Sequence, residues 1–214
     1  MADQSETVKR RGVMLVLAAP SGAGKSTIAR RLLAEDPMID LSISATTRPI
    51  RGSEQEGVHY FFLSEDAFKA RRDEGAFLEW AEVHGNYYAT PRAAVEKSLA
   101  AGRDVLFDID VQGAEQLKRQ MPEDVVGIFV LPPSMPVLKA RLQARAEDSK
   151  AAMEVRLKNA IGEIGRWRDY EYVVINDNLD EAYDQVRSIM IAERAKRTYQ
   201  NVIPRHVEML LKGE

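Results

Sequence analysis

A short apolar run followed at once by a glycine-rich turn constrains this chain more than any other feature of its sequence. The apolar run covers residues 13–18, and the turn over residues 19–26 reads Ala-Pro-Ser-Gly-Ala-Gly-Lys-Ser. A short apolar run bounded by a glycine turn is typical of a buried parallel strand. Apolar spacing over residues 26–33 then predicts a helix. The order strand, loop and helix is the one in which such a loop binds phosphate groups.

The residue types in this turn suit a triphosphate. Small residues let backbone N–H groups point at phosphate oxygens, and the following helix presents its positive N-terminal end. Lys25 is expected to reach the β- and γ-phosphates, and the Ser26 hydroxyl to bind Mg²⁺. Ala19 replaces the first glycine of the usual pattern, which costs little where φ is negative. The predicted triphosphate site comprises Ala19, Pro20, Ser21, Gly22, Ala23, Gly24, Lys25, Ser26 and Thr27.

Asp108 follows a second apolar run, residues 105–107. The aspartate that directs Mg²⁺ in phosphate-loop proteins occupies such a place, so Asp108 is a candidate metal residue beside Ser26. On spacing alone Asp108 can also be a plain carboxylate at a strand end. Asp110 lies two residues further on and points to the same side in extended chain.

Strand and helix patterns alternate along the rest of the chain. This alternation predicts an α/β fold with a central parallel sheet flanked by helices. Two insertions interrupt the pattern: a glycine- and aromatic-rich segment, read as a small α+β subdomain, and an arginine-rich helical one. The expected strands are 60–63, 77–80, 105–107, 125–131 and 172–175, and the expected helices are 92–101, 134–168 and 179–190, with a further helix starting at residue 64.

Composition limits the classes of partner. The chain has 214 residues with 30 Lys and Arg, 33 Asp and Glu, and a formal net charge of −3, which argues against a surface built for nucleic acid. It contains no cysteine, so disulfides and thiolate metal sites are excluded.

No apolar run approaches transmembrane length. Basic residues 9–11 imitate the start of a secretory signal, but the apolar run behind them leads into the glycine turn. We expect a soluble, cytoplasmic protein without a membrane partner.

The motifs that follow the phosphate loop resemble the guanylate kinase family, in order, at the family's spacing and over nearly the whole chain. They read Ser-Ala-Thr-Thr-Arg-Pro-Ile-Arg at 44–51, Gly-Val-His-Tyr-Phe-Phe at 57–62, Phe-Leu-Glu-Trp-Ala-Glu-Val-His-Gly-Asn-Tyr-Tyr at 77–88, Asp-Ile-Asp-Val-Gln-Gly at 108–113, Leu-Pro-Pro-Ser at 131–134 and Ile-Asn-Asp at 175–177. The resemblance implies transfer of a phosphoryl group from ATP to GMP, with Mg²⁺. It also implies a phosphate-loop kinase fold in one domain, with a core (about 12–42, 92–133 and 170–214), a GMP-binding subdomain (about 43–91) and a lid (about 134–169).

The resemblance assigns the GMP site to the first insertion. Ser44 and Glu79 would read guanine, with Asp108 and Asp110 beside the nucleotide. The residues that would hold the GMP phosphate are Arg48, Arg51, Tyr60 and Tyr88, with Thr90 at a position where the family often has serine.

The physical chemistry of guanine agrees with that assignment. Guanine presents N1–H and an exocyclic amine side by side, and the Glu79 carboxylate can accept both bonds, whereas adenine presents an acceptor at N1. Sites built on buried hydrogen bonds discriminate by roughly 10⁴-fold or more. Taken singly, Glu79 reads as a surface charge and Arg48 with Arg51 as a solvated basic turn. Two arginines with two tyrosines fit a phosphate better, because guanidinium pairs bidentately with phosphate oxygens.

The second insertion carries the expected lid. Arg141 and Arg145 are spaced i, i+4 and therefore share a helix face, and Arg156 follows on a later helix; such arginines can also form a solvated basic face. The resemblance places these arginines over ATP and adds Asn176 to its site. We expect Lys25, Arg48, Arg141 and Arg156 to act on the transferring group through positioning and charge stabilisation.

Other functions remain open at this stage. A guanylate-kinase-like domain can be a non-catalytic protein-interaction module, whose mark would be a decayed phosphate loop or missing lid arginines. A kinase for another nucleoside monophosphate would conflict with Ser44 and Glu79. A bare nucleotide switch would leave the first insertion unexplained. Oligomeric state and dGMP preference are not encoded in any motif.

Overall fold

The computed structural model describes residues 10–109, 111–144 and 150–213. Its centre is a parallel five-stranded sheet in the order β2 (Ile39–Leu41), β7 (Asp104–Phe107), β1 (Met14–Ala18), β8 (Val125–Leu131) and β9 (Tyr172–Ile175). Strand β1 lies in the middle and pairs with β7 and β8 in parallel register. The phosphate loop at the end of β1 is therefore at the centre of the sheet's carboxyl edge, where ligands of open α/β sheets bind.

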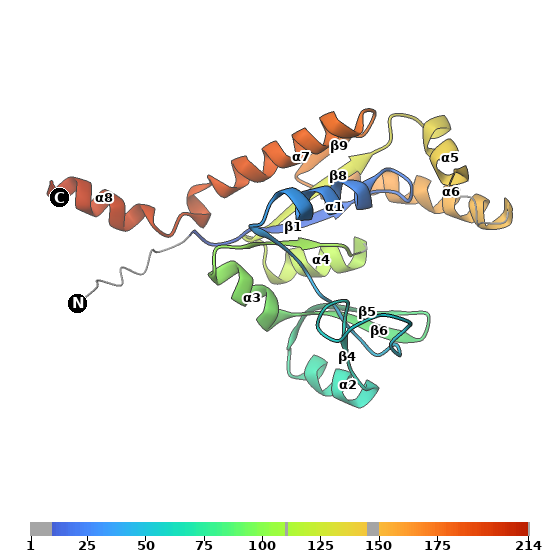
Figure 1. Ribbon diagram of the computed structural model, residues 1–214, viewed down its shortest axis with the longest axis horizontal. Coiled ribbons are helices and arrows are strands. Elements are labelled where there is room, and N and C mark those ends of the chain that lie inside the picture. The colour runs from blue at the N-terminus through green and yellow to red at the C-terminus, as the bar shows by residue number, and fades with distance from the viewer. Residues whose placement is uncertain (1–9, 110, 145–149, 214) are drawn as a thin grey trace.

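Helices cover both faces of this sheet, as Figure 1 shows. Alternate side chains of the strands point to opposite faces, which divides the core in two. Helices α1 (Lys25–Glu35) and α7 (Leu179–Arg194) pack against Leu15, Leu17 and Ile128. Helices α3 (Arg92–Ala100) and α4 (Val111–Gln120) pack against the other face at Val16 and Phe107. The predicted α/β fold with a flanked parallel sheet is confirmed.

The first insertion forms a second sheet. Its four strands lie in the order β4 (Phe61–Phe62), β3 (Ala45–Thr46), β6 (Asn86–Pro91) and β5 (Phe77–Val83). Helix α2 (Glu65–Asp73), capped by the Ser64 side chain, covers it through the buried Phe68. In Figure 1 this subdomain lies below the parallel sheet.

The second insertion is helical, as predicted, and its helices are separate elements. Helix α5 (Met135–Gln143) begins behind the capping Ser134, and α6 (Lys150–Ile164) runs into a 3₁₀ turn, η1 (Gly165–Asp169). Leu138 and Leu142 of α5 form a small core with Ala160 of α6. This core is separate from the two core clusters of the main sheet.

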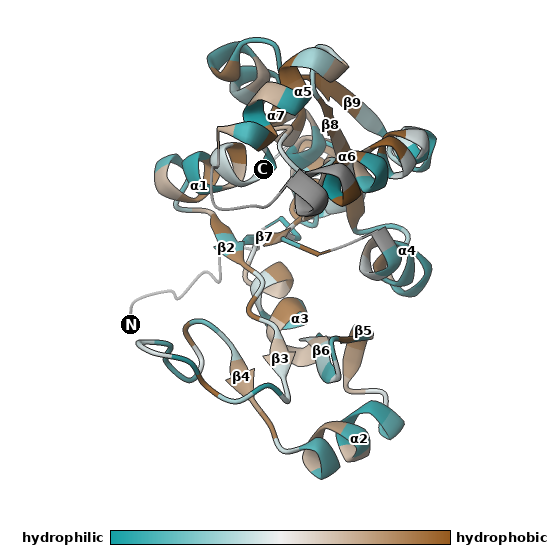
Figure 2. Cartoon of the chain, turned by 90° about the vertical axis from the view of Figure 1, so that its right-hand side faces the viewer, coloured by the Kyte–Doolittle hydropathy of each residue, from teal (hydrophilic) through white to brown (hydrophobic). Residues whose placement is uncertain are grey.

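Several elements differ from the sequence prediction. Helix α4 and strand β6 were not predicted, and neither was α8 (Ile203–Lys212), which follows a short turn, η2 (Arg197–Tyr199), and projects from the body in Figure 1. Figure 2 shows the strands β8 and β9 in the brown of hydrophobic residues, with much of α2 and α4 in teal. Within the described residues, no helix is long and apolar enough to span a membrane.

Candidate active site

The phosphate loop joins β1 to α1 through two glycines in the left-handed region. Gly22 has φ 90° and Gly24 has φ 103°, and Gly24 is the N-cap of α1. A side chain at Gly24 would also meet Asn176, whose amide nitrogen would lie 2.2 Å from the added Cβ. Glycine is thus required here by backbone angle and by space alike.

Asn176 holds the loop from behind. Its buried side-chain amide donates to the carbonyl oxygen of Ala23 at 2.7 Å, and the Ala23 N–H donates to Pro20 at 3.0 Å. Asn176 was predicted to contact ATP. The contact in the structure is to the loop itself, so this side chain shapes the phosphate site.

Most of the predicted triphosphate residues line one pocket of about 420 Å³, together with Asp108 and Ile109. Ala23 and Thr27 do not line it. Lys25 forms an ion pair with Asp108 across the pocket. The Glu163 carboxylate of α6 also borders the pocket and accepts a bond from the Ser21 N–H at 3.3 Å. The sequence patterns did not point to Glu163, because only the fold of the lid brings it to the loop.

The donor set in this pocket fits a magnesium ion bound with a nucleotide. Ser26 and Asp108 both line it, as predicted. No cluster of three His, Cys, Asp or Glu side chains able to hold a metal occurs among the described residues. Mg²⁺ in kinases is held by one or two protein oxygens plus substrate phosphates and water. A hydroxyl and one carboxylate beside the phosphate loop meet that requirement.

The second pocket lies in the first insertion and measures about 420 Å³. Five predicted GMP residues line it, Asp108 and four from the first insertion. Those four are Ser44, Tyr60, Glu79 and Tyr88. Asp108 and Ile109 line it as well, so the two pockets share a wall.

Arg48 is buried beside the second pocket without lining it, with 6% of its surface exposed. Its guanidinium lies 5.3 Å from the centre of the Tyr60 ring, and Tyr60 contacts Tyr88 edge to face at 6.1 Å. The three predicted phosphate residues are therefore brought together. Arg51 is exposed and does not line the pocket.

Glu54 is a residue of this site that the sequence patterns did not single out. Its carboxylate accepts two bonds from Arg48 at 2.7 and 3.0 Å and one from the Arg51 N–H at 2.8 Å. This pairing raises the pKa of Arg48 and lowers the pKa of Glu54. Glu54 thus fixes the Arg48 side chain and the turn that carries Arg51.

Thr90 occupies a different place from the one predicted. It was grouped with the phosphate residues, but its buried hydroxyl donates to Glu79 Oε1 at 2.6 Å. The reason is register, because Thr90 on β6 lies directly opposite Glu79 on β5. Thr90 therefore lies on the Glu79 side of the pocket. Asp110 lies outside the described residues.

The lid arginines are placed unequally. Arg141 donates to the backbone carbonyl of Asn176 at 3.1 Å, which ties α5 to the end of β9. Gly22 of the phosphate loop lies under Leu138 and Leu142 of the same helix. Arg156 is exposed on α6, and Arg145 lies outside the described residues.

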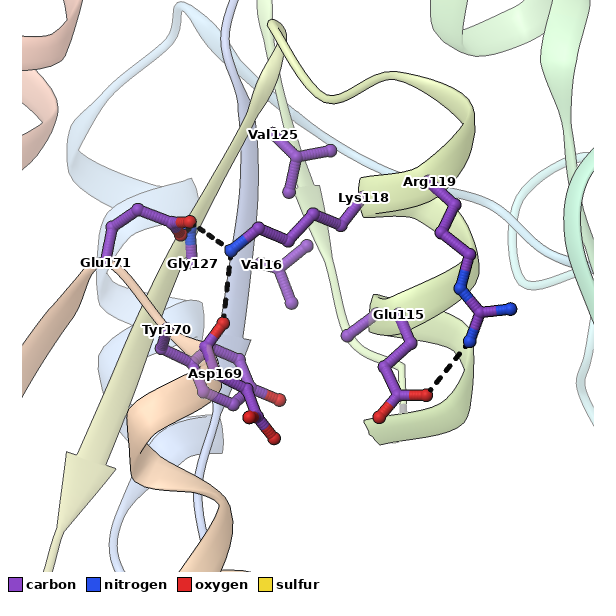
Figure 3. Close-up of a pocket in the computed structure, with 10 residues that line it drawn as sticks. Val16, Glu115, Lys118, Arg119, Val125, Gly127, Asp169, Tyr170 and Glu171 are labelled. Carbon is purple, nitrogen blue, oxygen red and sulfur yellow. Dashed lines mark hydrogen bonds and ion pairs between the residues drawn. The ribbon is translucent and has the colours of Figure 1, made fainter.

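A further pocket lies beneath α4 and is drawn in Figure 3. Its floor includes Val16 and Val125, and charged side chains surround it. Those charges pair with one another: Lys118 bonds Glu171 and the Asp169 carbonyl, and Arg119 pairs with Glu115. Lys118 and Arg119 thus each have a partner of opposite sign in the pocket wall.

Two nucleotide-sized pockets that share a wall, one of them built on a phosphate loop, define a nucleotide phosphotransferase. The sequence model of the guanylate kinase family matches residues 11–193. The guanylate kinase of Mesorhizobium japonicum is 60% identical over 91% of this chain and 89% of its own length. That of Agrobacterium fabrum is 55% identical over 97% and 94%. The chain belongs to the guanylate kinase family.

A solved structure agrees with this assignment. The crystal structure of guanylate kinase from Anaplasma phagocytophilum superposes with a TM-score of 0.71 at 36% sequence identity, covering 94% of this chain and 96% of that one. The prediction of the family from sequence motifs is confirmed.

Proposed function

We propose that the chain transfers the γ-phosphoryl group of ATP to GMP, giving ADP and GDP, and that it acts on dGMP as well. The observation that carries the proposal is the shared wall of the two pockets. Asp108 and Ile109 border both the phosphate loop and the pocket of Ser44, Tyr60 and Glu79. A donor phosphate and an acceptor phosphate would therefore meet beside Asp108, as in-line transfer requires.

The chain's own residues supply the positioning and most of the charge. The backbone of residues 19–26 would hold the β- and γ-phosphates, and Lys25 would turn from Asp108 towards them. Ser26 and Asp108 would hold Mg²⁺, which neutralises phosphate charge when bound. Arg48 with Tyr60 and Tyr88 would hold the GMP phosphate. Arg141, Arg145 and Arg156 would approach from the lid.

Closure would bring these cations around the transferring group. Lid closure would also exclude water and limit hydrolysis of ATP. The phosphate monoester of GMP has a second pKa near ~6, so it is mostly a dianion at neutral pH. Its oxygen can attack without a general base, and the proposal requires none.

Guanine would be selected at Glu79 and Ser44. The Glu79 carboxylate is 7% exposed and accepts from Thr90, so it is held in one orientation. Ser44 would donate to the guanine O6. We propose cytoplasmic purine nucleotide metabolism as the setting, with small-molecule substrates and no nucleic acid or membrane partner.

A coupled assay of ADP formation tests the proposal. ATP with Mg²⁺ is offered against GMP, dGMP, AMP, UMP and dTMP. We expect turnover with GMP and dGMP and at least about 10³-fold lower kcat/KM with the others, since buried hydrogen bonds discriminate strongly. Equal turnover of AMP would point to a kinase for another monophosphate, and no turnover with any acceptor would point to a non-catalytic module.

A further inference from the structure

The Glu79 carboxylate owes its direction to an irregularity in strand β5. The pairing of β5 with β6 shifts register between Phe77 and Glu79, which is the signature of a β-bulge. A bulge re-aims the side chain that follows it. Strand β5 is also the edge strand of its sheet, so sheet pairing holds Glu79 from one side only, through β6.

Helix α4 of the core occupies the unpaired side of this edge. The Gln116 side chain bonds the main chain of Trp80 twice: its oxygen accepts from the Trp80 N–H at 3.2 Å, and its amide donates to the Trp80 carbonyl at 3.0 Å. Exchange of both bonds is what a residue of a neighbouring strand would supply. The peptide immediately after Glu79 is thus tied to the core.

Gly113, one turn earlier on α4, is buried and lies directly against the carboxylate. A Cβ added at Gly113 would lie 3.1 Å from Glu79 Oε2 and 3.4 Å from Glu79 Cδ. Its φ is not in the left-handed region, so backbone angle does not explain a glycine here. Glycine is a weak helix former, and the space it leaves is filled by Glu79.

We infer that Gly113 and Gln116 are positioning residues for guanine recognition. Thr90 bonds one oxygen of Glu79, and the absence of a side chain at Gly113 leaves room for the other oxygen. Gln116 ties the main chain next to Glu79 to helix α4 of the core. The inference rests on the proposed function, because it assigns a role in reading the acceptor base. It also gives a role to the contact between α4, an element of the core, and β5 of the first insertion.

Four variants test the inference by steady-state kinetics with GMP, IMP and ATP. Gln116→Ala removes both bonds to Trp80, and Gln116→Glu keeps only the acceptor for the Trp80 N–H. Gly113→Ala adds one methyl group against Glu79. Gln120→Ala is the matched control, because Gln120 lies one turn along the same helix and bonds Arg92 instead of β5.

We expect Gln116→Ala and Gly113→Ala to raise KM for GMP by about tenfold, since displacement of a positioned group by about 1 Å costs up to about 10²-fold. KM for ATP should stay within about twofold. Preference for GMP over IMP, which lacks the exocyclic amine, should fall in the same variants, and Gln116→Glu should lie between wild type and Gln116→Ala. Gln120→Ala should resemble wild type.

Thermal unfolding separates this role from simple packing. Gly113→Ala gains helix propensity but crowds Glu79, so its Tm should stay close to that of the wild type while GMP recognition weakens. Unchanged KM for GMP and unchanged GMP over IMP preference in folded Gln116→Ala and Gly113→Ala would overturn the inference, as would a parallel rise in KM for ATP. Failure of the wild-type enzyme to use GMP would instead overturn the proposed function.

Discussion

Charged side chains of both pockets contact partners of opposite sign within the chain. Lys25 pairs with Asp108, and Arg48 pairs with Glu54. Each pair holds a cation in or beside its pocket, so less side-chain freedom is lost when a phosphate binds. The cost is competition, because the phosphate must draw the cation away from a carboxylate or share it.

Replacement of Lys25 should lower enzyme activity strongly. We expect Lys25→Ala to lower kcat by at least about 10³-fold, because the phosphate-loop pocket loses the lysine that would stabilise the charge of the transferring group. GDP formation in the coupled assay measures the loss, and circular dichroism checks the fold. Lys69→Ala, which removes a surface pair with Glu65, serves as control. Near-normal turnover by a folded Lys25→Ala enzyme would contradict the mechanism.

Glu79 should affect the binding of GMP, which accepts the phosphoryl group, and leave the binding of ATP unchanged. Glu79→Gln keeps one carbonyl oxygen but replaces the other carboxylate oxygen with an NH₂ group. One of the two hydrogen bonds to guanine is then lost, and the NH₂ group faces an N–H group of the base. We expect KM for GMP to rise by at least about tenfold, with KM for ATP nearly unchanged. An unchanged KM for GMP would show that guanine is read elsewhere.

At the scale of elements, one buried carboxylate joins three segments. Asp104 at the start of β7 is fully buried and accepts from Arg10, from the Val13 N–H and from Arg194 of α7. Bonds from two cations and a backbone amide offset the loss of its hydration. The same contacts tie two segments to the sheet: the residues that lead into β1, and the end of α7.

Removal of this carboxylate should cost stability without touching the site. We expect Asp104→Ala to lower the free energy of unfolding by about 3 kcal/mol, because the partner cations remain partly buried. Urea denaturation measures the change, and Asp184→Ala, at an exposed position of α7, is the control. A loss below about 1 kcal/mol would show that the network contributes little net stability.

The edge strand β2 carries a pH-dependent contact. Arg103 and then Ser98 bond Asp40 and hold the pKa of its carboxyl below the ordinary value. A lowered folded pKa contributes stability above the unfolded value, and that stability is lost as pH falls through the folded value. Asp40→Asn should therefore show a shallower loss of stability below about pH 4 than wild type. Equal slopes in acid urea titrations would refute this role.

At the scale of the whole molecule, the sheet core stands between two attached units. The first insertion has its own small core around Phe68 and Ala45, and the lid has one around Leu138 and Ala160. Separate cores allow each unit to shift as a body. The two pockets nevertheless share Asp108 and Ile109, so a shift of either unit would change the wall of both pockets.

A single ligand that spans both pockets should therefore bind more tightly than its halves. A dinucleotide joining adenosine and guanosine through a chain of phosphates gains from linking the two binding events. We expect it to raise Tm beyond the combined shifts of ADP and GMP, at roughly 2–4 °C per additional kcal/mol for a chain of this size. A shift no larger than that of ADP alone would mean that the pockets are not occupied together.

The sequence by itself determined the fold class, the phosphate loop and the family, because these are written in local patterns. The apolar run before residues 19–26 and the spacing of the later motifs can be read without knowing how the elements pack. The residues of each pocket could also be predicted in large part, since Ser44, Glu79, Lys25 and Ser26 lie in those motifs.

Only the tertiary structure decided how the side chains are held. Thr90 pairs with Glu79 because β5 and β6 align in one register, and Asn176 reaches Ala23 because β9 ends beside the loop. Glu54, Glu163 and Gln116 join the site without belonging to any recognisable pattern. The physical reason is that hydrogen-bond partners are chosen by distance in space, and distance across separate elements is set by packing, which no local pattern of residues records.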